Sequence, residues 1–243
     1  MGDKIGRPKA GQEPLNRERI LAAALRLVDE HGMEALSMRR LAAELKVDPM
    51  AIYYHLPNKR AILAGLVERV FAELRVPSAK SKAWQDRVRA VARAYHGLAK
   101  AHPNLVLYLV TDRESAAVAA LELNEALYEA LAEAGLSPRM IMRASDLVVD
   151  YVNGFALAEV SGPVGQPGEW RELLALLNEQ PPEQFPALRH VFGSLAGKDL
   201  ASGFGAGLDI ILAGIAAIAA NANTERGAVA LTGQPRPRPP SAR

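Results

Sequence analysis

The chain of 243 residues contains no cysteine and only five histidines. Without cysteine there can be no disulfide scaffold, no thiolate zinc site and no cysteine nucleophile, and a reducing cytoplasm suits the protein. The histidines stand at positions 31, 55, 96, 102 and 190, in no spacing that is typical of a metal site or a catalytic triad. We therefore expect no catalytic residues, no metal and no cofactor, and we interpret the protein as not being an enzyme.

Long apolar segments are also missing. The first residues, MGDKIGRPKAGQEP, have no apolar core and do not resemble a secretion signal. The longest apolar run, Ile210 to Ala220, has 11 residues including a glycine, whereas a helix needs about 20 to span a bilayer. The sequence thus predicts a soluble, cytoplasmic protein with no membrane partner.

Strand-like alternation is absent, although an ordinary domain has about a fifth of its residues in strands. The sequence therefore predicts an all-α fold. Helical periodicity, interrupted by glycine and proline, predicts helices over 17–31, 36–45, 49–55 and 59–74, and then over 83–101, 104–111, 114–134, 138–160, 169–179, 183–195 and 200–222.

The most informative stretch is residues 36–59. Apolar residues at helical spacing predict a short first helix with Leu36, Leu41, Ala42 and Leu45 on its buried side. Asp48 suits the N-cap of a second helix and Pro49 its first position. Ile52 is placed to face inward, and the other side chains are expected outside: Met50, Ala51, Tyr53, Tyr54 and His55. Two helices joined by a tight turn, the second with such an exposed face, are typical of a DNA-reading helix-turn-helix.

The run from Ile52 to Lys59, IYYHLPNK, followed by the apolar helix from Arg60, resembles the DNA-binding domain of TetR-family bacterial transcriptional regulators. The close resemblance covers residues 15–70. It implies a homodimer that binds a palindromic operator in double-stranded DNA, usually as a repressor. It also implies a set of DNA-contacting residues: Arg39, Pro49, Met50, Ala51, Tyr53, Tyr54, His55 and Lys59.

The chemistry of these side chains suggests their roles. Arg39 can bind guanine through two hydrogen bonds or bind a phosphate, whereas the side chains of residues 49–51 can make only apolar contacts, for instance with thymine methyl groups. Tyr53, His55 and Lys59 suit phosphates, and Tyr54 suits a sugar or a base. One of the two tyrosines is expected to be half buried.

The charge distribution agrees with this interpretation. Residues 1–75 carry 13 Lys and Arg against 10 Asp and Glu, residues 76–222 carry 12 against 16, and residues 223–243 carry 4 against 1. A basic front end on an acidic body is typical of a DNA-binding module attached to a domain that does not bind DNA. Ordinary surface scatter would give a difference of the same size.

The predicted helix over 59–74 has more apolar surface than a three-helix domain can bury, so its far end is expected to pack into the rest of the chain as a lever. The body beyond it is expected to bind a small-molecule effector. Candidate contacts combine bulk with a polar group near the middle of the body: Trp84, Tyr95, His96, Tyr108, Thr111, Tyr151, Asn153, Phe155 and Glu159. For each of them plain packing is the simpler alternative.

The last predicted helix is rich in alanine, glycine and isoleucine and is apolar nearly all round, so it must be covered. The segment 204–212 resembles the final helix of repressors with a tetracycline-repressor-like C-terminal domain, which pairs with an earlier helix, here 138–160, in a four-helix dimer interface. The residues implied at this interface are Tyr151, Phe155, Phe204, Leu208, Ile211 and Ile215. The stretch 107–111 lacks the histidine that holds magnesium-bound tetracycline in the tetracycline repressor, so that chemistry is not expected.

We accordingly expect a flexible basic arm (1–14), a helix-turn-helix DNA-binding domain (15–75), a helical ligand-binding and dimerisation domain (76–222) and a disordered basic tail (223–243). Two alternatives remain open. The helix pair could be purely structural in a small-molecule-binding protein or an enzyme, although no catalytic spacing supports the latter. A non-specific architectural DNA-binding protein would need a broadly basic surface, which the acidic middle of the chain contradicts.

Overall fold

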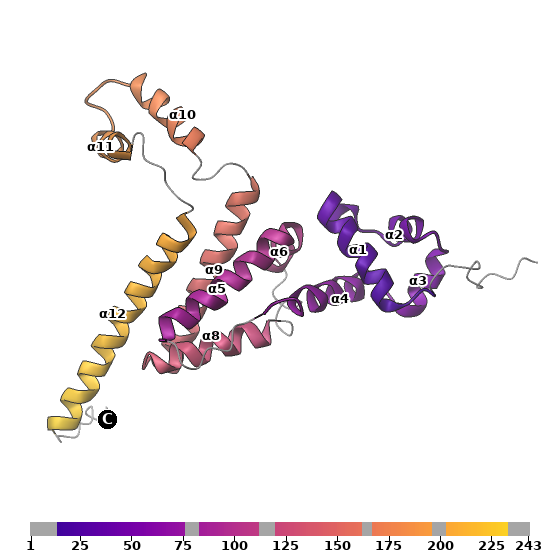
Figure 1. Ribbon diagram of the computed structural model, residues 1–243, viewed down its shortest axis with the longest axis horizontal. Helices are drawn as coiled ribbons and strands as arrows, with labels where there is room; N and C mark the ends of the chain where they lie inside the picture. The colour runs from indigo at the N-terminus through magenta and orange to yellow at the C-terminus, as the bar shows by residue number, and fades with distance from the viewer. Residues whose placement is uncertain (1–13, 76–82, 112–119, 162–166, 196–202, 233–243) are drawn as a thin grey trace, which may run out of the picture.

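The computed structural model describes residues 14–75, 83–111, 120–161, 167–195 and 203–232. Within these ranges every regular element is a helix, as the sequence predicts (Figure 1). The first helices form a small N-terminal domain at one end of the molecule, and the others form the body (Figure 1).

The N-terminal domain consists of α1 (Arg17–His31), a 3-10 turn η1 (Met33–Ala35), α2 (Met38–Leu45), α3 (Pro49–His55) and α4 (Lys59–Phe71). Its core contains large side chains that are almost completely buried: Ile20, Leu36, Leu41, Ile52, Ile62 and Leu66. The residues predicted to be buried in the helix-turn-helix are therefore in the core: Leu36, Leu41, Ala42 and Leu45 from the first predicted helix, and Ile52 from the second.

Each α-helix of this domain begins at a side-chain cap that accepts a hydrogen bond from a backbone N–H in the first turn. The caps are Asn16, Ser37, Asp48 and Asn58. Such a cap contributes about 1 kcal/mol and fixes the residue at which a helix begins. Helix α2 starts at Met38, and not at residue 36 as expected, because Ser37 caps it and leaves Leu36 in the preceding connection.

The body contains α5 (Trp84–Ala101), α6 (Pro103–Thr111), α8 (Leu121–Glu133), α9 (Pro138–Ser161), α10 (Pro167–Asn178), α11 (Pro186–Leu195) and α12 (Gly203–Thr232). Helices α5, α8 and α9 pack on one another, α6 packs on α9 and on α1, and α12 packs on α9. The α10–α11 hairpin lies apart from this bundle (Figure 1). Arg189 closes the hairpin by donating to the backbone carbonyls of Leu177, Gln180, Pro181 and Gln184, which satisfies the end of α10.

The C-terminal tail prediction was wrong over 223–232, because α12 continues to Thr232. The segment after Ala222 contains good helix formers, and the next proline comes only at Pro235. The predicted arm lies outside the described residues except for Pro14, as does the tail from 233. The helix predicted from residue 114 is described from Leu121 onward, and α10 begins at Pro167 because proline is tolerated in a first helical turn.

Helix α12 has an unusually apolar composition. Its segment Gly203–Asn221, 19 residues with a mean hydropathy of 1.9, is long and apolar enough to cross a membrane, and 28% of it is buried in the protomer. The 11-residue run considered from the sequence misses this because the flanking glycines, alanines and Phe204 extend it. A helix in the interior or at an interface of a soluble protein meets the same criterion. The observation therefore identifies an exposed apolar surface on α12 that another apolar surface would cover.

The predicted contact between the end of α4 and the body is present. The ring of Phe71, the last residue of α4, lies 6.1 Å from the ring of Tyr95 on α5, and both residues are buried. The helix that starts beside the outward face of α3 therefore ends in the core shared with the body.

Candidate nucleic-acid interface and effector region

One side of helix α3 packs against the rest of the N-terminal domain, and its other side is exposed to solvent. Asp48 caps it, Pro49 occupies its first position, and Ile52 is fully buried. Tyr54 is 87% exposed and Met50 is 71% exposed, so two large side chains four residues apart share the free face of this helix. Tyr53 is 40% exposed, so it is the tyrosine that is half covered.

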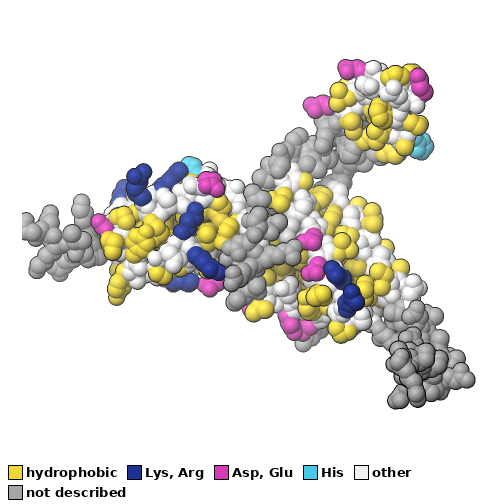
Figure 2. Space-filling model, turned by 180° about the vertical axis from the view of Figure 1, so that it is seen from behind, with side chains coloured by type: hydrophobic (Ala, Val, Ile, Leu, Met, Phe, Trp, Pro, Cys, Tyr) yellow, Lys and Arg dark blue, Asp and Glu magenta, His cyan; other side chains and the backbone are white. Residues whose placement is uncertain are grey.

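The other predicted DNA-contacting residues surround this helix. Arg39 on α2 and Lys59 at the start of α4 are exposed, and Pro49, Ala51 and His55 are partly exposed. The rings of Tyr54 and His55 meet edge to face with centroids 5.2 Å apart, so they stand side by side at the end of α3. Figure 2 shows Lys and Arg side chains gathered on the N-terminal domain, with fewer on the visible face of the body.

Two cations that the sequence reasoning did not select also lie at this surface. Arg40 follows Arg39 on α2 and is exposed, and Lys46 is exposed in the turn between α2 and α3. Lys46 has a positive φ of 55°, which its place at the C-cap of α2 requires. A basic residue in the turn of a helix-turn-helix was the signal that could have identified Lys46.

Lys59→Ala is expected to weaken binding to all DNA sequences alike and to lower the slope of log affinity against log salt by about one, because one phosphate contact is lost. A salt titration of binding by fluorescence anisotropy measures this slope. Arg69→Ala, an exposed cation near the other end of α4, is the matched control and should leave the slope unchanged. An unchanged slope in the Lys59 variant would remove this residue from the interface.

In the body, an aromatic cluster joins α5, α9 and the start of α12. The imidazole of His96 stacks on Phe204 with centroids 4.0 Å apart and an interplanar angle of 10°. Phe155 meets both rings edge to face, at 5.7 Å and 5.4 Å. Tyr151 stacks on Phe204 at 5.5 Å, and its hydroxyl donates to the Phe204 carbonyl at 2.8 Å.

Polar groups border this cluster. His96 Nε2 lies 2.7 Å from Glu159 Oε2, and Lys100 Nζ lies 3.4 Å from Glu159 Oε1. Between the same two helices, the Tyr95 hydroxyl donates to Asn153 Oδ1 at 2.7 Å, and burial raises the pKa of Tyr95 to about 12. The cluster thus offers flat apolar surfaces beside an imidazole, a carboxylate and an ammonium group.

The structure brings together four of the nine predicted effector residues: His96, Tyr151, Phe155 and Glu159. Two others, Tyr95 and Asn153, form a separate hydrogen-bonded pair. Trp84 does not join them, because it stands at the opposite end of α5, about 18 Å from His96 at 1.5 Å per residue. Tyr108 lies on α6 and is partly exposed, and the side chain of Thr111 lies outside the described part of the structure. Phe204, predicted only for the dimer interface, packs in this cluster against His96 and Phe155.

The predicted dimer-interface residues divide into two groups. Phe204, Leu208 and Ile215 are at most 6% exposed and pack in the core of their own protomer, and Tyr151, Phe155 and Ile211 are partly exposed. The outward face of α12 carries other residues, Ile210 and Ile218, which are 75% and 44% exposed, with Gly214 between them. Because this helix is apolar nearly all round, the sequence does not distinguish the side that packs on α9 from the free side.

Gly207→Ala is expected to destabilise the protein by about 1–3 kcal/mol through overpacking. A Cβ atom there would lie 2.8 Å from Tyr151 Cζ and closer still to the hydroxyl oxygen, so the ring would have to leave the Phe204 carbonyl. Thermal unfolding measures the change. Gly97→Ala on α5, where nothing lies within 4 Å, is the control and should be neutral or slightly stabilising.

Within the described ranges, no group of three or more His, Asp or Glu residues is placed to hold a metal ion.

Comparisons with known proteins agree with this geometry. Residues 20–66 match the profile of bacterial regulatory proteins of the tetR family, and residues 76–219 match the tetracyclin repressor-like C-terminal domain. An HTH-type transcriptional regulator of Saccharopolyspora erythraea is 31% identical over 205 residues, which cover 84% of this chain and 86% of that protein.

Two solved structures extend the likeness. Apo ActR from Streptomyces coelicolor has a TM-score of 0.74 at 30% identity, covering 87% of this chain and all of that one, and ActR has also been solved in complex with actinorhodin. BioQ with its natural double-stranded DNA operator has a TM-score of 0.61 at 25% identity, covering 84% of this chain and 99% of that one. With an exposed α3, an all-helical body and both parts matched, the chain belongs to the TetR family of ligand-responsive, DNA-binding transcriptional regulators.

Proposed function

We propose that the protein acts in the cytoplasm as a homodimeric repressor that binds a palindromic operator and releases it when an aromatic small molecule binds beside His96. The exposed face of α3 carries this proposal. A helix anchored by one buried residue, with Tyr54 and Met50 in solvent and cations on both flanking helices, is built to meet a large anionic partner.

The dimer is supported by the free face of α12. Ile210, Gly214 and Ile218 follow one another at helical spacing on this face, and the neighbouring alanines allow close approach of a second helix. On α9, which packs beside α12, Leu147 is 51% exposed. Pairing α9 and α12 of one copy with those of another would cover both faces in a four-helix bundle, and it accounts for the apolar character of α12 without a membrane.

A twofold dimer explains why the operator should be palindromic. Two copies of α3 would enter successive major grooves about 34 Å apart, so each half-site would present the same bases to the same residues. Met50 and Ala51 would make apolar contacts, for instance with thymine methyl groups, and Arg39 would bind guanine or a phosphate. Tyr53, His55 and Lys59 would bind phosphates and hold the register.

The effector class follows from the chemistry of the cluster around His96. The rings of His96, Phe155 and Phe204 favour a flat aromatic molecule, because aromatic surfaces stack and meet edge to face. Glu159 and Lys100 offer hydrogen bonds to hydroxyl or carboxyl groups on that molecule. The complex of the related ActR with actinorhodin is consistent with a ligand-binding body.

The test is release of operator DNA by a panel of hydroxylated aromatic compounds, measured by fluorescence anisotropy. In the His96→Ala variant the concentration that gives half release should rise at least about tenfold, corresponding to about 1.4 kcal/mol, while operator affinity without compound stays the same. His190→Ala, on the α10–α11 hairpin, is the control. If no compound releases the DNA, or if both histidine variants respond like the wild type, the effector proposal fails.

A further inference from the structure

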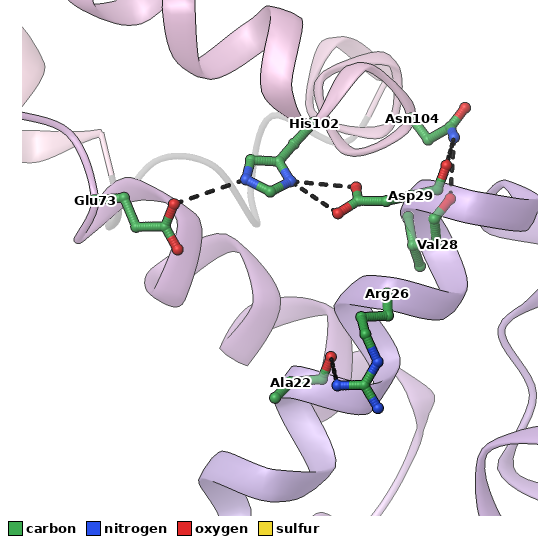
Figure 3. Close-up of polar contacts among 7 residues, drawn as sticks. All are labelled: Ala22, Arg26, Val28, Asp29, Glu73, His102 and Asn104. Atoms are coloured by element: carbon green, nitrogen blue, oxygen red, sulfur yellow. Dashed lines mark hydrogen bonds and ion pairs between the residues drawn. The ribbon is translucent and has the colours of Figure 1, made fainter. Parts of the chain in front are cut away.

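A histidine stands at the junction between the N-terminal domain and the body. His102 follows the end of α5, and its side chain is 12% exposed. Its Nδ1 lies 3.0 Å from Asp29 Oδ2 on α1, and its Nε2 lies 3.7 Å from Glu73 Oε2 in the turn after α4 (Figure 3). One imidazole from the body thus faces carboxylates from two segments of the N-terminal domain.

The start of α6 completes the same junction. Asn104 Nδ2 donates to the backbone carbonyls of Val28, at 3.0 Å, and Asp29, at 3.3 Å, in the last turn of α1 (Figure 3). The Val28 carbonyl also accepts from the backbone N–H of Gly32 at the C-cap of α1, so Asn104 adds a donor from the body at this helix end. Leu105 beside Asn104 is completely buried, which makes this contact a packed interface.

The number of protons on His102 decides how many carboxylates it can bind. A neutral imidazole has one N–H donor, and its other nitrogen carries a lone pair. With the proton on Nδ1, Asp29 receives a hydrogen bond and Glu73 faces the lone pair of Nε2, which repels it. Only the imidazolium has a donor for both acids.

Acidic groups predominate around His102. The charged groups at the junction are Asp29 and Glu30 from α1 and Glu73 after α4. Burial raises the pKa of Asp29, and His102 opposes that rise. The nearby basic groups have partners of their own: Arg26 reaches Glu44, Lys100 reaches Glu159, and Arg75 donates to the Ala72 carbonyl.

We propose that His102 is a positioning residue that fixes the DNA-binding domain on the body in a proton-dependent way. As an imidazolium it ties the end of α1 and the end of α4 to the body, and as a neutral imidazole it releases Glu73. Because α4 begins at Lys59 beside α3, release at one end of α4 loosens the orientation of the DNA-reading face at the other. Histidine changes charge near neutral pH, so modest acidification would tighten the joint.

The absence of cysteine in the chain makes a direct test simple. Ala43→Cys on α2 and Glu129→Cys on α8, both at exposed positions, allow one spin label in each domain. Labelled protein is diluted into an excess of unlabelled protein, and the distribution of label distances is measured without DNA or effector at pH about 6 and about 8, on either side of the range in which histidine titrates. The wild type should give a narrow distribution at the lower pH and a broad one at the higher pH.

Three variants separate a proton-dependent role from a merely structural one. His102→Gln should give a broad distance distribution at both pH values, because glutamine stays neutral. Glu73→Gln should be narrow at both, because its amide N–H can donate to the lone pair of neutral Nε2, and this half-exposed side chain can change without affecting the core. His31→Gln, at the exposed end of α1, should keep the response of the wild type.

A wild-type distribution of the same width at both pH values would overturn the proposal, as would a pH response that survives in His102→Gln or in Glu73→Gln. The measurement uses neither DNA nor effector, so its outcome is independent of the operator and effector proposals.

Discussion

Ile210→Glu is expected to convert the proposed dimer into monomers and to lower operator affinity by at least about 100-fold. Ile210 is 75% exposed in the protomer and lies on the free face of α12, so the protomer itself should tolerate a carboxylate there. In a twofold interface the substitution would place two like charges in an apolar seam, which is costly. A monomer can bind only one half-site at a time, so it loses the increase in affinity that two linked DNA-binding domains provide, typically a factor of about 10²–10⁴.

Sedimentation velocity measures the oligomeric state, and anisotropy with the intact operator and with an isolated half-site measures the affinities. The half-site should bind the variant and the wild type alike. Leu121→Glu makes the same kind of change at a leucine that is 62% exposed on α8, a helix that packs on α5 and α9, and it should leave the dimer intact. A dimeric Ile210→Glu variant would show that another face joins the two copies.

Tyr54→Ala is expected to lower operator affinity by about 10- to 100-fold and to leave thermal stability unchanged. The side chain is 87% exposed, and the contact described for its ring is the one with His55. If Tyr54 contacts a base, the variant should lose about 1–3 kcal/mol of binding free energy with the operator and much less with scrambled DNA. If the ring packs on a sugar, both kinds of DNA lose affinity alike.

Binding isotherms for operator and scrambled DNA in the same salt distinguish these roles. Tyr128→Ala, a partly exposed tyrosine on α8 in the body, is the matched control and should affect neither DNA. Full retention of operator affinity by the Tyr54 variant would contradict the placement of α3 in the major groove.

The N-terminal domain was largely predictable because its structure is set by local chemistry. Asn16, Asp48 and Asn58 each stand where a cap is needed, Gly32 adopts the positive φ that ends α1, and Ile52 alone points inward from α3. Each of these features depends on residues within one turn of helix, so a single sequence reveals it.

The rest of the site depends on contacts between residues that lie far apart in the chain. His96 and Glu159 could be selected one at a time, but their pairing depends on how α5 crosses α9. Asp29 and His102 are separated by 73 positions, and each alone looks like an ordinary helix-end residue. The burial of Leu208 and exposure of Ile210 likewise depend on which side of a uniformly apolar helix meets α9, and periodicity cannot tell the sides apart.

His96 lies on α5, and His102 directly follows the last residue of this helix, about 9 Å further along its axis. A molecule that displaces His96 therefore acts on the same helix as the proton that His102 binds. Thermodynamic reciprocity then requires that effector binding take up or release protons wherever effector affinity varies with pH. Calorimetry of effector binding in two buffers of different ionisation heat would register this exchange as a difference in apparent enthalpy.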